Sequence, residues 1–336
     1  MARLDHLNAR IGVRRALLLG AAGMRELLGR VTLESRLEAL SRSAWGPDLP
    51  AGLARLDEPL AAVEAALRRA LARDAAWLVR QAEGARGRAL LAAYLALGEG
   101  DAVKALLRGI AAGVPPAAAA ALVPPTAALG PGDLSALAES GSPEALADAL
   151  ASRGSPLGEA LRAALPSDVA GLLPAEVAID RAAAARAARA CAGLGEDARI
   201  LASHVADRVD ARNAATLLAL GGAGGGEALF VAGGRRLDGA EFARLASASG
   251  ADLREGLAAA FPGAAAGLAR PWSADRALER ALLAPLRRGA RASPLSIAVP
   301  LAWLAERTAE ARRIALVLRG AALGLPGEEI LDLAEA

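Results

Sequence analysis

Three stretches of this 336-residue chain resemble one another, and they constrain its fold more than any other feature. They are DAVKALLRGIAAGVP (101–115), DARNAATLLALGGAG (210–224) and EARRIALVLRGAALGLP (310–326), and their acidic first residues lie roughly 100 residues apart. Each has the signature of a helix that begins at an acidic residue and ends at glycine. The spacing predicts three similar helical units of roughly 100 residues each.

The amino-acid composition favours helices throughout. Ala, Leu, Arg and Glu dominate, and all four are good helix formers. Aromatic residues make up only 2% of the chain, and Val, Ile, Tyr and Phe, which favour strands, are scarce. We therefore predict an all-α protein with cores rich in Leu and Ala. We place its three helical domains at residues 1–115, 116–221 and 222–336.

Charge and hydropathy argue against nucleic-acid binding and against a membrane span. The chain holds 39 basic and 37 acidic residues, and no basic cluster sits beside aromatic residues that could stack on bases. The uncharged stretch from Gly109 to Gly132 holds five prolines, so it predicts a linker and not a spanning helix. Arg14 and Arg15 precede a short apolar run, but leucines at helical spacing favour an amphipathic helix over an export signal. We expect a cytoplasmic protein.

The glycine-rich stretch LALGGAGGGEALFVAGGRRL (218–237) raises the question of a phosphate-binding loop. A P-loop needs Lys and then Ser or Thr after its last glycine, whereas Glu227 follows Gly226 here. A dinucleotide fingerprint needs a strand before the glycines and a helix after them, whereas ATLLALGG has the pattern of a helix that ends at glycine. We interpret the stretch as a helix end followed by a flexible connector.

No group of residues has the spacing of a catalytic or metal site. Cys191 is the only cysteine, and His6 and His204 are the only histidines. They are too few for a zinc shell without several carboxylates. We interpret Cys191 as a small buried thiol and His204 as a solvated or capped side chain. Carboxylates such as Glu306 and Glu310 lie among arginines at helical spacing, as on a solvated helix face. The residues predict neither an enzyme nor a cofactor.

Four collinear segments resemble the C subunit of bacterial and archaeal V/A-type ATPases, the counterpart of the eukaryotic d subunit. They are LDHLNARIGVRRALLL (4–19), SRSAWGPDL (41–49), RVDARNAATLLALGGAGGGEALFVAGGRRLDGAEFARL (208–245) and LERALLAPLRRGARASPLSIAVPLAWLAERTAEARRIALVLRGAALGLP (278–326). The chain departs from the family at Trp45, where the family has Tyr. Of the family's acidic-x-x-Asn helix starts, only Asp210 with Asn213 is kept.

The resemblance implies three similar helical domains in a pseudo-threefold arrangement around a funnel-shaped cavity. It also implies a non-catalytic rotor subunit that joins the central stalk of the ATPase to the membrane rotor ring and transmits torque for H⁺ or Na⁺ transport. Such a subunit is attached peripherally to the membrane. The candidate contacts with these partners lie at the three helix starts and in one loop: Asp101, Lys104, Asp210, Asn213, Glu310, Arg313, Arg235 and Arg236.

Two other interpretations of the residues stay open. A helical-repeat adaptor that binds other proteins would form an open superhelix instead of units around a hole. An enzyme whose site the sequence does not reveal would bury a cluster of charged residues around a closed pocket.

Overall fold

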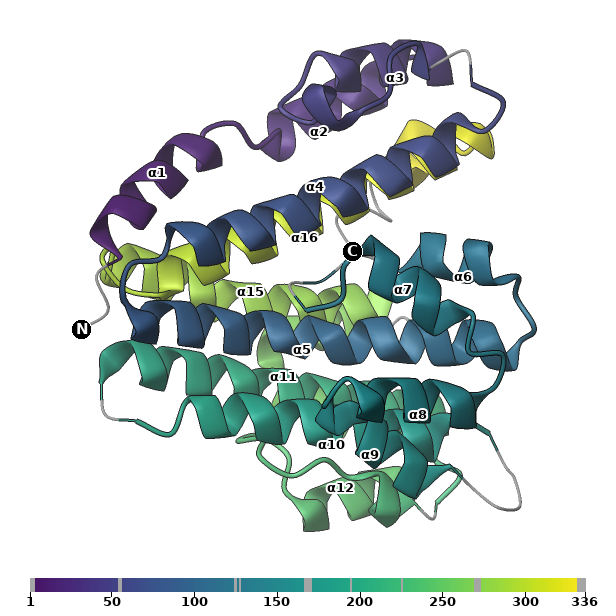
Figure 1. Ribbon diagram of the computed structural model, residues 1–336, viewed down its shortest axis with the longest axis vertical. Helices are drawn as coiled ribbons and strands as arrows, with labels where there is room; N and C mark the ends of the chain where they lie inside the picture. The colour runs from purple at the N-terminus through teal and green to yellow at the C-terminus, as the bar shows by residue number, and fades with distance from the viewer. Residues whose placement is uncertain are drawn as a thin grey trace.

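All regular structure in the described residues is helical, which confirms the expected all-α class (Figure 1). The computed structural model describes residues 4–53, 56–123, 126, 128–165, 171–193, 195–224, 226–268 and 273–330. The α-helices are α1 (Asp5–Arg15), α2 (Gly20–Gly29), α3 (Leu33–Ser41), α4 (Pro59–Gln81), α5 (Gly84–Ala111), α6 (Pro116–Leu122), α7 (Pro131–Ala138), α8 (Pro143–Ser152), α9 (Pro156–Ala164), α10 (Leu173–Ala190), α11 (Glu196–Leu220), α12 (Gly239–Ala246), α13 (Gly250–Ala260), α14 (Ala265–Leu268), α15 (Ala274–Ala292) and α16 (Ala298–Ala322). Short 3-10 turns cover Gly46–Asp48, Gly226–Leu229 and Pro262–Ala264.

Local chemistry accounts for many helix boundaries. Pro occupies the first turn of α6, α7, α8 and α9, where its missing N–H has no helical partner to lose. The Ser142 hydroxyl accepts a hydrogen bond from the Ala145 amide at the start of α8, and Asp238 does the same for the Glu241 amide at the start of α12. Gly221, with φ of 59°, ends α11 in the left-handed conformation. The first part of the glycine-rich stretch is therefore a helix end, as predicted.

Six long helices form three antiparallel pairs, α4 with α16, α5 with α10, and α11 with α15. One end of every pair lies in a single hydrophobic cluster, which we call the hub (left in Figure 1). The hub also takes in one face of α1. Its members from the long helices include Leu78, Leu91, Leu97, Ala187, Leu201, Val205, Leu286, Ala290, Leu301 and Leu304.

The other ends of the three pairs lie in three separate hydrophobic clusters, which we call lobes. Lobe A joins the second half of α16 to α2, α3 and the first half of α4. Lobe B joins the second half of α5 to α6–α9 and the first half of α10. Lobe C joins the second half of α11 to α12–α14 and the first half of α15. Each lobe therefore connects to the hub through one pair of long helices.

This division of the core differs from the predicted ranges 1–115, 116–221 and 222–336. Lobe A unites segments from both ends of the chain, and every long helix is shared between the hub and a lobe. Length is the reason. Helix α11 has 25 residues and α5 has 28, and a helix rises about 1.5 Å per residue, so each is longer than the diameter of a small core.

The uncharged stretch predicted as a linker forms part of lobe B. Pro116 is the first residue of α6, and Ala119 and Val123 are buried in the lobe B cluster. A Cβ atom at Gly109 would lie 3.1 Å from the Cβ of Ala119, so the glycine lets α5 and α6 approach closely. The expectation of a free linker is wrong for the described residues of this stretch.

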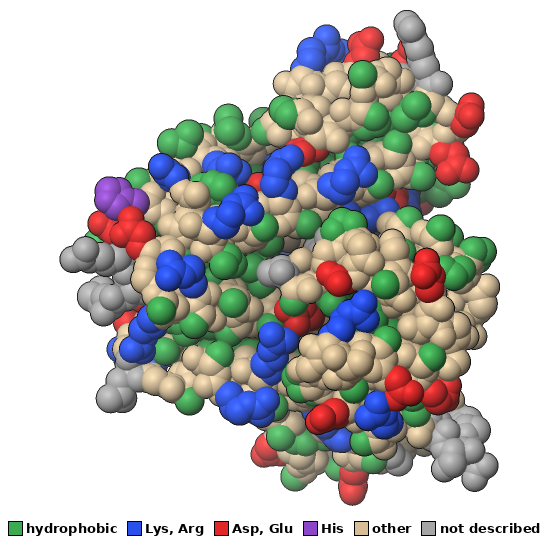
Figure 2. All heavy atoms as spheres, viewed as in Figure 1, with side chains coloured by type: hydrophobic (Ala, Val, Ile, Leu, Met, Phe, Trp, Pro, Cys, Tyr) green, Lys and Arg blue, Asp and Glu red, His purple; other side chains and the backbone are tan. Residues whose placement is uncertain are grey.

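The lobes spread apart as they leave the hub. Figure 1 shows α4 and α16 side by side and directed away from α5 and α10, and Figure 2 shows a notch between the corresponding parts of the surface. Across the described ranges, no helix combines the length and the apolar character needed to cross a bilayer. The pseudo-threefold arrangement around a funnel-shaped cavity stays a prediction.

Candidate partner interface

Cys191 and His204 are both buried in the core, whereas His6 is exposed. Cys191 is buried, and burial raises the pKa of its thiol. His204 is buried with its ring 5.5 Å from that of Tyr94. Burial, and then the charge of Arg208, lower the pKa of His204 to about 3, so the imidazole is neutral near pH 7. The expectation of a buried thiol is confirmed. Of the two alternatives for His204, solvated or capped, the solvated one is wrong because the side chain is buried. Among the described residues, no group of three or more His, Cys, Asp and Glu side chains could hold a metal ion.

The three repeated acidic residues lie inside long helices, whereas the sequence predicts them at helix starts. Asp101 is in α5, Asp210 in α11 and Glu310 in α16. Each lies where its helix leaves the hub and enters a lobe. The last hub residues are Leu97, Val205 and Leu304, and the first lobe residues are Ala102, Ala211 and Ala311. We call these three places the junctions.

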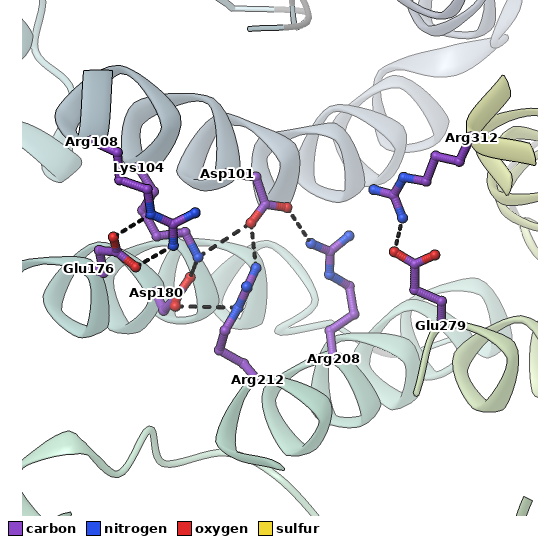
Figure 3. A network of polar contacts seen from close by, with 9 residues as sticks. All are labelled: Asp101, Lys104, Arg108, Glu176, Asp180, Arg208, Arg212, Glu279 and Arg312. Atoms are coloured by element: carbon purple, nitrogen blue, oxygen red, sulfur yellow. Dashed lines mark hydrogen bonds and ion pairs between the residues drawn. The ribbon is translucent and has the colours of Figure 1, made fainter. Parts of the chain in front are cut away.

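The first junction is a network of ion pairs between α5, α10 and α11 (Figure 3). The half-exposed Asp101 carboxylate pairs with Arg208, at 3.1 Å, and with Arg212. Lys104 is buried, and its Nζ lies 2.6 Å from Oδ1 of Asp180 and 3.3 Å from Oδ1 of Asp101. Burial raises the pKa of Asp101, but the charges of Arg208, Arg212 and Lys104 together hold it well below its usual range. This carboxylate therefore stays ionised and ties lobe B to α11.

The second junction explains the remainder of the glycine-rich stretch. Asp210 is fully buried, and its carboxylate accepts hydrogen bonds from the successive amides of Arg235, Arg236 and Leu237, at 2.8, 3.0 and 3.2 Å. A Cβ atom at Gly234 would lie 2.0 Å from Oδ1 of Asp210, so only glycine allows this approach. Successive amides of this kind form an anion-binding nest. Here the anion is the protein's own carboxylate and not a phosphate.

Residues around this nest are also held internally. The Asn213 side chain donates to the carbonyl of Val231 and accepts from its amide, at 2.8 and 2.9 Å. The exposed guanidinium groups of Arg235 and Arg236 lie 2.7 and 3.7 Å from the Asp207 carboxylate. Arg236 also donates to the carbonyl of Ala260 at 3.0 Å. The loop that carries the two arginines is thereby fixed on α11.

The third junction surrounds Glu310, which is 4% exposed. Its carboxylate accepts hydrogen bonds from the Gly20 amide at 3.1 Å and from the Trp45 indole at 2.9 Å. Arg307 lies over the Trp45 ring at 3.3 Å from its centroid and pairs with Asp74 at 3.2 Å. These contacts connect α16 to the first residue of α2, to the turn around Trp45 and to α4.

Carboxylates and arginines expected on a solvated face also lie in this region. Glu306 is 8% exposed and pairs with Arg15 at 2.5 Å and with Arg287 at 2.8 Å. Arg14 pairs with Asp74 at 3.1 Å and lies over the ring of Trp77. The interpretation of Glu306 and Glu310 as a solvated helix face is therefore wrong, because α1 and the turn around Trp45 cover that face. The amphipathic helix expected around Arg14 and Arg15 is present as α1.

The eight predicted contact residues thus divide into two groups. Buried side chains with internal partners are Lys104, Asp210, Asn213 and Glu310. Side chains with exposed surface are Asp101, Arg313, Arg235 and Arg236. Contact with a partner stays a prediction for all eight residues, and the first group also holds the junctions together inside the molecule. The sequence alone does not show that Asp180, Asp207 and Trp45 are junction residues. The one signal is that the segment around Trp45 resembles a turn of the family.

Comparisons with known proteins identify the family of the chain. The family model for the ATP synthase (C/AC39) subunit matches residues 7–333. The chain belongs to this family, which makes it a non-catalytic subunit of a rotary ATPase. It is similar to the C subunit of the V-type ATP synthase from one strain of Thermus thermophilus, with 32% identity over 334 residues that cover 97% of this chain and 96% of the relative. The same figures hold for the corresponding C subunit from a second strain of that organism.

Proposed function

We propose that this chain is the central-rotor subunit that joins the central stalk of its ATPase to the membrane rotor ring and transmits torque between them. It works at the cytoplasmic face, attached to the membrane through the complex. The observation that carries the proposal is that three lobes are fixed to one hub by pairs of continuous helices. A charged junction lies where each pair passes from the hub into its lobe.

The helix pairs are suited to carry a load because they are closely packed. Gly100, one residue before Asp101, has no Cβ, and a Cβ there would lie 3.3 Å from the Cβ of Ala183 on α10. The backbone of α5 therefore lies close to α10 at the first junction. Protein interiors packed at this density deform little. A twist applied to lobe B is thus passed to the hub instead of being absorbed by bending.

The junctions also tie the lobes to one another. The Asp101 network joins lobe B to α11. Figure 3 also shows Arg312 of α16 paired with Glu279 of α15, and this pair joins lobe A to lobe C. The Arg312 pair is exposed and contributes little by itself. Lys104 is different, because it is buried between Asp101 and Asp180. Removal of one partner from a buried ion pair costs about 3–5 kcal/mol, so this junction resists opening.

The proposed socket for the central stalk lies between the diverging lobes. Its contact residues are Asp101, Arg313, Arg235 and Arg236, whose side chains have exposed surface. Arg313 has no hydrogen bond or ion pair to any other residue that the structure describes. Arginine forms planar, bidentate pairs with carboxylates, so an acidic segment of the stalk is the expected counterpart.

Reconstitution of the ATPase with and without this chain tests the proposal. ATP hydrolysis by the detached head should not need the chain, whereas ATP-driven ion uptake into vesicles should be absent without it and restored when it is added. Ion uptake of normal rate in the depleted complex would refute the proposal. So would faster hydrolysis by the isolated head when the chain is added, because a coupling subunit has no catalytic role.

A double variant tests the role of the first junction. R208Q/R212Q removes two cations that pair with Asp101. We expect fewer ions transported per ATP in this variant. The matched control is R254Q in α13, because Arg254 is exposed and has no ion pair among the described residues. Equal coupling in the double variant and the control would show that this junction does not carry load.

A further inference from the structure

The hub end of the molecule carries the same basic residue in each of the three helix pairs. Helices α4, α10 and α15 all run toward the hub, and they end at Gln81, Ala190 and Ala292. The residue before the last is arginine in all three, namely Arg80, Arg189 and Arg291. The three arginines therefore occupy equivalent positions in three different units.

These arginines differ from those of the junctions because they have no partner among the residues that the structure describes. All three are exposed, and none has a hydrogen bond or ion pair to another residue within the described part of the chain. A cation in the last turn of a helix stabilises it by about 0.3–1 kcal/mol through the helix dipole. That effect explains a basic residue in each last turn, but it does not require that all three lie unpaired at the same end.

The surroundings strengthen the positive charge of this end. Arg199 near the start of α11 and Arg288 near the end of α15 are exposed there too. Figure 2 shows basic side chains over the left part of this face, where α4 and α10 end and α5 begins. Leu295, between α15 and α16, is 59% exposed at the same end and offers an apolar contact. The surface thus combines exposed arginine side chains with an exposed leucine.

We infer that the hub end is a docking surface for a carboxylate-rich protein surface, with Arg80, Arg189 and Arg291 as its three charged contact points. This inference rests on the proposed function. If the stalk enters between the diverging lobes, the hub end is the face left for the membrane ring, and the acidic surface belongs to the ring.

A protein surface fits this end better than an anionic bilayer does. Asp5, Glu83 and Glu196 are also exposed near it, and the Glu196 carboxylate accepts a hydrogen bond from the Ser293 hydroxyl. A uniform layer of lipid phosphates would be repelled by these carboxylates. A protein can place basic groups against them and acidic groups against the arginines, and such complementary placement fixes the orientation of a complex.

Binding of the full chain to the detergent-purified membrane ring tests the inference, with the isolated central-stalk subunits as the second ligand. We expect R80E/R189E/R291E to weaken ring binding at least tenfold and to leave stalk binding unchanged. Ring binding of the wild type should also weaken as salt is raised, because exposed ion pairs are screened. The matched control is R25E/R254E, which reverses two exposed arginines in α2 and α13 that have no ion pair within the described ranges. Circular dichroism shows whether each variant keeps its helices.

The outcomes separate this inference from the function on which it rests. If the wild type binds both ring and stalk but the triple variant binds the ring equally well, the inference fails and the proposed function stands. If the triple variant loses the stalk and keeps the ring, the hub end faces the stalk and the inference is overturned. Charge-dependent binding of the wild type to phosphatidylglycerol vesicles, without binding to the ring, would replace the protein partner with lipid. A wild type that binds neither ring nor stalk refutes the proposed function itself.

Discussion

Replacement of Asp210 by alanine is the sharpest test of the junctions. The Asp210 carboxylate is buried and accepts three backbone hydrogen bonds, from Arg235, Arg236 and Leu237. Each hydrogen bond to a charged group contributes about 1.5–3 kcal/mol. Water can replace the bonds to Arg235 and Arg236, which lie at the surface, but it cannot reach the amide of Leu237, which is 2% exposed. We therefore expect Asp210→Ala to destabilise lobe C by about 3 kcal/mol, less than the sum of three bonds.

Native-state hydrogen exchange measures this loss where it occurs. A loss of about 3 kcal/mol corresponds to roughly hundredfold faster exchange, since about 1.4 kcal/mol is a factor of ten. The acceleration should appear at the amides of residues 235–237 and of α12, and not in lobe A. Asp238→Ala is the control, because it removes an ordinary N-cap bond to the Glu241 amide, worth about 1 kcal/mol. An Asp210→Ala effect no larger than that of Asp238→Ala would refute the reasoning.

Four further substitutions test other parts of the structure. Trp45→Phe removes the indole N–H that donates a hydrogen bond to the Glu310 carboxylate. The free energy of unfolding, measured by urea titration, should fall by about 1–3 kcal/mol. An unchanged free energy of unfolding would mean that water replaces the bond. In Gly158→Ala, the new Cβ would lie 2.3 Å from the amide nitrogen of Ala151, and we expect this overpacking to lower the free energy of unfolding by about 1–3 kcal/mol. In Gly12→Ala the new Cβ meets open space, so the free energy of unfolding should rise by up to about 1 kcal/mol. Because the pKa of His204 is lowered from 6.5 to about 3, the unfolded state binds the proton first and stability is lost as the pH falls below about 6.5. Between about pH 7.5 and pH 5.5, the free energy of unfolding of the wild type should therefore fall by about 1 kcal/mol more than that of His204→Leu. Equal losses in the two proteins would show that the His204 imidazole can be charged in the folded state.

Helical structure could be predicted from the sequence because its signals are local. Leucines at helical spacing and good helix formers identify helices such as α1, and Gly221 marks the end of α11 as expected. The same local signals gave the wrong position for Asp101. An acidic residue that directly follows the Gly98-Glu99-Gly100 segment looks like a helix start, whereas the helix continues through it. Here α5 packs closely against Ala183 of α10 through Gly100, a contact that no neighbouring residue reveals.

The junctions could not be predicted because their partners are distant in sequence. Glu310 looks like a surface carboxylate among arginines, because the sequence does not show that the indole of Trp45, 265 residues away, donates a hydrogen bond to it. Asp210 and Gly234 are each ordinary residues, and only their contact shows why a carboxylate and a glycine are needed. The hydrophobic cluster of lobe A could not be predicted for the same reason, since a sequence read from one end to the other does not show that α16 completes the core begun by α2 and α3.

Lobe A is assembled from both ends of the chain, and this affects how it folds during synthesis on the ribosome. Lobes B and C are built from continuous segments, so each can fold soon after its second long helix emerges. The residues of α2, α3 and α4 must instead wait, with their leucines uncovered, until α16 has been made. Mutations or translational pauses that delay α16 should therefore leave newly made chains dependent on chaperones, even where the finished protein is stable.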